Sequence, residues 1–323
     1  MVILRFLEGL RNPVFDVLFS LITRLGEELI FILIGLLFYW CIDKKKGYFL
    51  LSVGFIGTLL NQFLKLCFRI PRPWVKDPTF TIVESAREAA TGYSFPSGHT
   101  QSAVGIFGGI ARITKSKIFR CLCVLACILV PLSRMYLGVH TPLDVGVSIL
   151  IALVLVFALK PLVDWLCKKK KGLVIYFSFL LVASIAFLLF VSFYPFPADI
   201  DPHNYESGVK NAYKILGCLL GLFAAYLIDV GYLHFEVKAS PMAQAAKLII
   251  GLLPLLAIKE GLRVPLAFLF GEMLGSGVRY SLLTFFAGAI WPMSFPWIAR
   301  TTDRLTQKIK ASKAKKQQKG TSD

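Results

Sequence analysis

The chain carries too little charge for a water-soluble protein. Only 17% of its 323 residues are Asp, Glu, Lys or Arg, and 56% are hydrophobic. The mean hydropathy is +0.68. A soluble globular domain has about 25% charged residues and about 45–50% apolar ones. The composition therefore excludes a soluble domain and predicts a polytopic integral membrane protein.

Three further absences narrow the class of protein. The first 26 residues lack an uninterrupted apolar stretch followed by a cleavage site, so a secretory signal peptide is not expected. The seven cysteines are odd in number and fall mostly in apolar runs, which implies packing residues and no disulfide framework. The net charge of +17 is dispersed over loops and a low-complexity tail, KIKASKAKKQQKG. Without a basic patch with interleaved aromatics, no nucleic acid partner is expected; the tail can rest on anionic lipid.

Apolar runs of membrane-spanning length dominate what is present. A helix that crosses a bilayer needs roughly 17–25 predominantly apolar residues. Nine runs approach this length, the first, third and eighth being weak: 28–42, 47–66, 97–113, 118–136, 143–163, 173–193, 211–230, 247–260 and 278–298. The sequence therefore predicts an all-α, polytopic helical bundle.

The N-terminal segment has a different pattern. Its polar residues recur three or four positions apart, which places one polar stripe on a helix in the membrane interface; they are Arg5, Glu8, Asn12, Asp16, Ser20, Thr23 and Glu27. The chain accordingly divides into four predicted parts. These are an interfacial amphipathic helix at 1–26, a core at 27–165, a C-terminal transmembrane extension at 172–298 and a basic tail at 299–323.

The distribution of Lys and Arg predicts the orientation. These residues are retained on the cytoplasmic side of membrane proteins. Alternate connections are rich in them, including 44–46, 112–120, 168–171 and the tail after Arg300. We therefore expect the tail in the cytoplasm, and the 67–96 loop and the N-terminal helix outside a bacterial plasma membrane.

Three polar clusters interrupt the apolar runs. They are KLCFRIPRP with Lys65 and Arg72, the PSGH of residues 96–99, and SRMYLGVHTPLD with Arg134, His140 and Asp144. By the alternation of spans, all three lie on the outer side. Ionisable groups at membrane depth are costly and mark functional sites. The clusters therefore predict one extracytoplasmic active site.

The residue types in these clusters favour phosphoryl transfer. Ser97 begins a helix, whose free N–H groups favour an anion, and Gly98 permits close approach to the main chain. Lys65, Arg72 and Arg134 would stabilise the charge that develops on the phosphoryl oxygens.

Two histidines supply the remaining chemistry. His140 and Asp144 are one helical turn apart, so the carboxylate can fix the imidazole tautomer and leave the other nitrogen free to attack phosphorus. His99 would protonate the leaving oxygen.

Each of these residues also has a structural interpretation. Asp144 completes a capping box with Thr141, Ser97 is an N-cap, and Lys65 alone would be a snorkelling lysine. A single histidine in such a position is more often a hydrogen-bonded structural residue than a catalytic one. Their joint spacing on one membrane face favours the functional interpretation.

The three clusters together resemble the type 2 phosphatidic acid phosphatases, whose pattern is K-x6-R-P, P-S-G-H and S-R-x5-H-x3-D. Every motif position matches, and the resemblance covers about residues 25–165. It implies a helical-bundle core and a metal-independent reaction through a phosphohistidine, with no cofactor. It also implies that His140 is the nucleophile, His99 the acid and Asp144 the orienting group, with phosphate bound by Lys65, Arg72, Ser97, Gly98 and Arg134.

The second half of the chain is less informative. Asp199, Asp201, His203 and Glu206 lie in a Pro-rich outer loop that is more typical of a solvated turn than of a metal site. The segment GLRVPLAFLFGEMLGSGVRY is equally compatible with a re-entrant loop and with a homodimer surface.

The expected function is that of a lipid phosphatase at the outer membrane interface. A site near headgroup level suits phosphorylated lipids, in the order polyprenyl diphosphate, phosphatidylglycerol phosphate and phosphatidate. The alternatives are a lipid phosphotransferase that uses the same phosphohistidine, an anion transporter and a catalytically idle scaffold.

Overall fold

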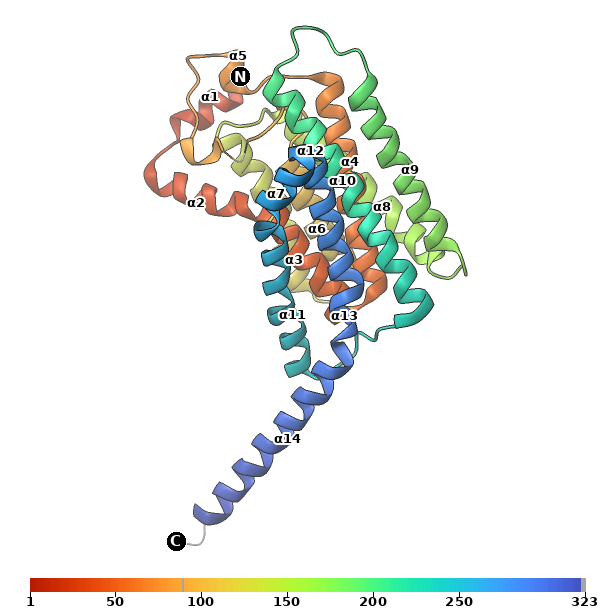
Figure 1. Ribbon diagram of the computed structural model, residues 1–323. Coiled ribbons are helices and arrows are strands. Elements are labelled where there is room, and N and C mark those ends of the chain that lie inside the picture. Colours follow the sequence, from red (N-terminus) through yellow and green to blue (C-terminus); the bar gives the residue numbers. More distant parts are fainter. Residues whose placement is uncertain (89, 321–323) are drawn as a thin grey trace.

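The computed structural model describes residues 1–88 and 90–320. Within these residues, side chains are described up to residue 311. Every regular element in these residues is helical (Figure 1). The longer helices are α1 (Val2–Gly9), α2 (Pro13–Thr23), α3 (Glu28–Leu37), α4 (Lys44–Phe68), α6 (Gly98–Ile113), α7 (Lys117–Tyr136), α8 (Pro142–Leu166), α9 (Gly172–Phe193), α10 (Pro202–Ile228), α11 (Pro241–Leu256), α12 (Arg263–Phe285) and α14 (Phe295–Gly320). The all-α prediction is confirmed; residues 321–323 of the predicted tail lie outside the described residues.

Helices long and apolar enough to cross a membrane make up most of the described chain. Seven meet this criterion: Lys44–Lys76, Lys117–Tyr136, Pro142–Leu166, Gly172–Phe193, Pro202–Leu233, Pro241–Gly261 and Arg263–Met293. The pair Pro13–Gly26 and Glu28–Ile42, bent by 49°, meets it only when taken together. The 97–113 run forms α6, whose 16 residues fall short of the criterion. The protein is an integral membrane protein.

The helices pack as two halves that share α4. In the first half α6 contacts α4, α7 and α8, and in the second α10 contacts α9 and α12. Contacts between α10 and α4 join the halves along much of the bundle (Figure 1). The predicted C-terminal extension is therefore packed against the core.

Side-chain caps fix where the core helices begin. The Asp43 carboxylate accepts a hydrogen bond from the Lys46 N–H at 3.0 Å at the start of α4. Thr141 and Asp144 form the predicted capping box of α8, with Pro142 in the first turn. At its other end α4 stops at Arg69, which adopts a left-handed conformation with φ 49°. Because that conformation ends the helix, the following loop turns back over the bundle.

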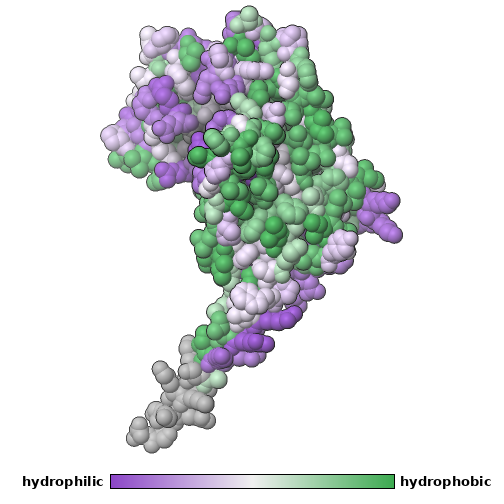
Figure 2. Space-filling view, in the orientation of Figure 1, coloured by the Kyte–Doolittle hydropathy of each residue, from purple (hydrophilic) through white to green (hydrophobic). Residues whose placement is uncertain are grey.

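Apolar side chains face outward around the bundle. Large exposed residues such as Phe179 and Val182 of α9 line its outer surface. In Figure 2 hydrophobic surface covers the helices, while hydrophilic surface gathers over the N-terminal segment and near the start of the basic tail. This banding matches a hydrocarbon region between two polar interfaces.

The N-terminal segment forms two helices, where the sequence predicted one. The break falls at Asn12 and Pro13, because Asn12 caps α2 through a 3.0 Å bond from the Phe15 N–H, and proline occupies the first turn. The polar side chains predicted to face water instead hold the loop after α4. Arg5 donates to Asp77 at 2.7 Å, and Glu8 accepts from the Thr81 N–H at 2.8 Å.

The glycine-rich segment before the last span folds back on itself. Gly271 has φ 77° and interrupts α12. A Cβ at Gly275 would lie 2.5 Å from the carbonyl oxygen of Leu266, so the two parts of α12 touch through that glycine. The re-entrant interpretation stays a prediction, because Arg263–Met293 as a whole is long and apolar enough to span a membrane. A homodimer contact stays a prediction.

Single cysteines test the predicted orientation. Phe80 in the 67–96 loop is only 3% exposed, so Val75, which is 60% exposed, is the better probe position in that loop. In a background without the seven native cysteines, we expect Val75→Cys to react with a membrane-impermeant thiol reagent in intact cells. Gln307→Cys on α14, at the other end of the bundle (Figure 1), should react only after lysis. The reverse labelling pattern would invert the orientation.

Candidate active site

The three motif clusters meet at one end of the bundle. Lys65 lies near the end of α4, Arg72 in the following loop, and His99 in the first turn of α6. Arg134 lies near the end of α7 and His140 just before α8. With Gly98, these five side chains line a cavity of about 380 Å³. The structure thus brings together residues that are up to 75 positions apart in the sequence.

His140 is held between a cation and a carboxylate. Arg72 Nη1 lies 2.9 Å from His140 Nε2, and Asp144 Oδ2 lies 3.6 Å from His140 Nδ1. Because a guanidinium only donates, Nε2 accepts and the ring proton sits on Nδ1, facing the carboxylate. Burial, with Arg72, Arg134 and Lys65 nearby, lowers the pKa of His140 well below its usual range. The imidazole is therefore neutral, with a lone pair on the nitrogen that faces the cations.

Asp144 has a structural role and an orienting role at once. Its Oδ2 accepts from the Thr141 N–H at 2.7 Å and from Ser94 Oγ at 2.6 Å. Its carbonyl oxygen accepts from the Ser97 N–H at 3.2 Å. The two interpretations of Asp144 as a cap and as the partner of His140 are therefore compatible. Ser94, which nothing in its sequence context singled out, ties the loop before α6 to this carboxylate.

The cations are fixed mainly by main-chain carbonyls. Arg72 donates to the carbonyls of Thr91 at 2.8 Å, Gly92 at 3.1 Å and Val139 at 3.0 Å. Lys65 donates to the carbonyl of Tyr93. Carbonyls orient a cation without neutralising it, so the cavity keeps an excess of positive charge.

Of the cations that line the described cavity, Arg134 is the one with the most unpaired nitrogen atoms available to an anion. It is fully buried, and its Nη1 donates to Thr23 Oγ1 at 2.9 Å. Among the described residues, its Nε and Nη2 have no hydrogen-bond partner. A buried charge without partners is destabilising unless an anion binds. The sequence places Thr23 only in the N-terminal polar stripe. Nothing in the sequence indicates its contact with Arg134.

The start of α6 differs in part from the prediction. Ser97 Oγ accepts from the Thr100 N–H at 3.4 Å, so this side chain caps the helix and does not line the cavity. Gly98 leaves open space, because the nearest atom to a Cβ there would be Asn61 Oδ1 at 3.7 Å. His99 Nε2 is buried and has no partner among the described residues. Gly98 and His99 thus face the cavity, with Ser97 behind them.

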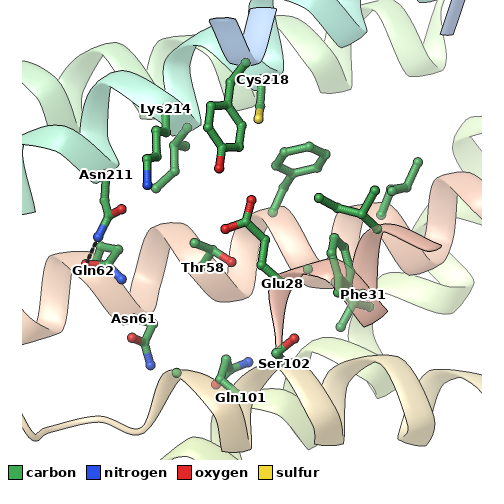
Figure 3. Close-up of a pocket in the computed structure, with 18 of the residues that line it drawn as sticks. Glu28, Phe31, Thr58, Asn61, Gln62, Gln101, Ser102, Asn211, Lys214 and Cys218 are labelled. Carbon is green, nitrogen blue, oxygen red and sulfur yellow. Dashed lines mark hydrogen bonds between the residues drawn. The ribbon is translucent and has the colours of Figure 1, made fainter. Parts of the chain in front are cut away.

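The C-terminal extension builds the opposite wall of the same cavity. Lys214 and Cys218 of α10 line it, together with Tyr280 and Leu283 of α12. Figure 3 shows Lys214 and Asn211 projecting from α10 toward the residues of α4. Asn211 Nδ2 donates to Gln62 Oε1 at 3.1 Å. The predicted function gave this half no role; the three- to four-residue spacing of polar and small residues on α10 is the signal that was missed.

Around the start of α10, the described residues form no metal site. Asp201 Oδ1 accepts from the Asn204 N–H at 2.7 Å and so caps α10. In the part of the chain that the structure describes, no three His, Cys, Asp or Glu side chains are close enough to hold a metal ion.

Comparison with known families identifies the class. The family model described as PAP2 superfamily matches residues 45–168, and the one described as PAP2 superfamily phosphatase, transmembrane extension, matches residues 213–302. The chain therefore belongs to the PAP2 superfamily, with a core followed by its transmembrane extension. The resemblance noted in the motifs is confirmed.

Individual relatives are more distant. Undecaprenyl-diphosphatase BcrC of Bacillus subtilis is 31% identical over 118 residues, 34% of this chain and 58% of that protein. A probable sphingosine-1-phosphate phosphatase of Dictyostelium discoideum is 27% identical over 261 residues, 75% of this chain and 60% of that protein. Mouse sphingosine-1-phosphate phosphatase 1 is 32% identical over 153 residues, 46% of this chain and 35% of that protein. The chain thus spans between about a third and three fifths of these relatives, and no solved structure matches it significantly.

Thermal unfolding with inorganic phosphate tests the anion site without any turnover. We expect phosphate to raise the Tm of the detergent-solubilised protein, because a ligand that binds only the folded state stabilises it. Arg134→Gln should weaken phosphate binding about 10- to 100-fold, the effect of losing charge-assisted hydrogen bonds. Arg279→Gln removes a buried arginine that does not line the cavity, and should keep the wild-type shift. Equal shifts in all three proteins would contradict an anion site at Arg134.

Proposed function

We propose that the protein is a metal-independent lipid phosphatase that acts through a phosphohistidine at the outer face of the membrane. The observation that carries the proposal is the neutral His140, whose Nε2 lies 2.9 Å from Arg72 Nη1 in a cavity that Lys65 and Arg134 also line. A nucleophilic nitrogen surrounded by cations suits a phosphoryl group better than any uncharged substrate. The names of the relatives, which include an undecaprenyl-diphosphatase and sphingosine-1-phosphate phosphatases, support it.

The first step makes the phosphohistidine. His140 Nε2 attacks phosphorus as the bond from phosphorus to the lipid oxygen breaks, and Arg72 then donates to phosphoryl oxygens instead of to Nε2. Protonated His99 gives its proton to the leaving oxygen. The bound phosphate supplies the negative charge that favours the protonated imidazole in this cationic setting. Asp144 stabilises the positive charge that His140 acquires.

The second step regenerates the enzyme. His99, now neutral, takes a proton from a water molecule as the water oxygen attacks phosphorus. The phosphorus–nitrogen bond breaks, its electrons return to His140 Nε2, and inorganic phosphate leaves. In both steps the three cations stabilise the negative charge on the phosphoryl oxygens, as Mg²⁺ does in metal-dependent phosphoryl transfer.

The apolar depth of the cavity argues for a lipid substrate. Beyond the cations its walls include Phe31 of α3, Leu51 of α4 and Leu222 of α10. Such walls suit the hydrocarbon beside a headgroup, since each buried methylene contributes about 0.8 kcal/mol. A soluble sugar phosphate would leave them without a matching surface.

Substitution of the two histidines tests the mechanism. We expect His140→Ala to abolish turnover, because no nucleophile remains, and His99→Ala to lower kcat by about 10²–10⁴, the usual effect of losing a general acid. His203→Ala, at an exposed histidine outside the cavity, is the matched control. A His140→Ala protein that folds and keeps wild-type turnover would rule out the phosphohistidine.

A substrate panel tests the activity itself. Phosphate release is measured from a polyprenyl diphosphate, phosphatidylglycerol phosphate, phosphatidate, a short-chain analogue and glucose 6-phosphate, with His140→Ala as the blank. We expect the long-chain lipids to have the highest kcat/KM. If glucose 6-phosphate equals them, the lipid assignment fails. A phosphorylated acceptor in place of free phosphate would make the protein a phosphotransferase, and release from no substrate would exclude the phosphatase activity.

A further inference from the structure

Two buried amide side chains next to the phosphate site lack hydrogen-bond partners. Gln101 of α6 is 4% exposed, and neither its Oε1 nor its Nε2 has a partner among the described residues. Asn61 of α4 is 2% exposed; its Nδ2 donates to the Pro96 carbonyl at 3.3 Å, but its Oδ1 has no partner in the described chain. Buried polar groups are nearly always bonded, so these two need an explanation. Both line the catalytic cavity (Figure 3).

The backbone around these amides is shaped to keep them at the cavity wall. A Cβ at Gly57 of α4 would lie 2.8 Å from Gln101 Nε2, so glycine lets this amide rest against the helix, and a larger residue would displace it. Asn61 Oδ1 lies next to the open space at Gly98, within the phosphate cradle. Gln101 follows Gly98 by three residues, or about 4.5 Å along the helix. The amides therefore flank the position of the first carbons beyond a bound phosphate ester.

Most of the side-chain atoms of Asn61 and Gln101 that are unpaired within the described chain are hydrogen-bond acceptors. Asn61 Oδ1 and Gln101 Oε1 can only accept, and the Glu28 carboxylate points into the cavity from α3 (Figure 3). Lys214 lies toward the α10 side, near Asn211 and Gln62 (Figure 3). Acceptors so placed call for a donor on the ligand, that is, a hydroxyl or an ammonium group. The acyl esters of phosphatidate and a prenyl chain offer none.

Resting on the proposed phosphatase function, we propose that Asn61 and Gln101 form a second subsite for a hydroxyl or amine next to the phosphate ester of the lipid. The substrate class is then a lipid phosphate with such a donor on the carbon beside the phosphate-bearing one. Of the three lipids favoured by the sequence, phosphatidylglycerol phosphate carries such a hydroxyl, whereas polyprenyl diphosphate and phosphatidate do not.

Three lipids of equal chain length separate the possibilities. A sphingoid base 1-phosphate carries an amine and a hydroxyl, a lysophosphatidate carries a hydroxyl alone, and a plain alkyl phosphate carries neither. We expect wild-type kcat/KM to be about tenfold higher for at least one donor-bearing lipid than for the alkyl phosphate, as one satisfied hydrogen bond allows. The preferred lipid identifies which donor the subsite takes.

Substitution of Gln101 locates the preference. Gln101→Met keeps the size of the side chain and removes both hydrogen-bonding atoms, so the preference ratio should fall to near one. Gln244→Met makes the same change on α11, outside the cavity, and should keep the wild-type ratio. Gly57→Ala, which pushes on Gln101 from α4, is a second route to the same loss if Gln101→Met does not fold.

The outcomes separate the two proposals. A wild-type enzyme that hydrolyses all three lipids equally, or a folded Gln101→Met that keeps the preference, overturns the subsite and leaves the phosphatase activity standing. A wild-type enzyme that hydrolyses none of the three, nor any lipid of the wider panel, overturns the proposed function instead.

Discussion

Three positive charges buried in one cavity are the constraint on which the rest of this structure depends. Lys65, Arg72 and Arg134 would repel one another and lose their hydration in any loosely packed bundle. The loop between α4 and α6 turns its carbonyls toward Lys65 and Arg72, and Thr23 reaches Arg134 from the N-terminal segment. Helix ends, loop and N-terminal segment are thus positioned around charges that a phosphoryl group would balance.

The same constraint explains why the two halves of the chain are bound so closely. Charged side chains that faced hydrocarbon on one side would be destabilising. Residues of α10 and α12 form the wall on that side. Direct bonds fix the closure, including Asn211 to Gln62 at 3.1 Å and Trp40 Nε1 to the Ala287 carbonyl at 2.8 Å. The three buried cations come from the first half of the chain, whereas the walls of the cavity come from both halves.

Local spacing explains which features could be read from the sequence. The four-residue interval of His140 and Asp144 and the capping box at Thr141 are properties of a single helical turn, and both hold. The convergence of the three motifs followed from the alternation of membrane spans. Thr23 could not be placed in this way, because its contact with Arg134 depends on how distant helices pack. The spacing on α10 marks the face that holds Lys214, but not the helices that this face meets. Ser97 was only half predictable, since a cap and a phosphate ligand share the same sequence signal.

The hydrogen bond from Arg134 to Thr23 links the motif-bearing core to the N-terminal segment. Thr23 lies well before residue 45, where the match to the superfamily begins, and so does Gly26, whose close approach to the His99 carbonyl leaves no room for a side chain. The catalytic motifs are therefore not a self-contained module. An N-terminal segment outside the shared core completes the surroundings of two motif residues, so relatives with unrelated N-termini must support the equivalent arginine by other means.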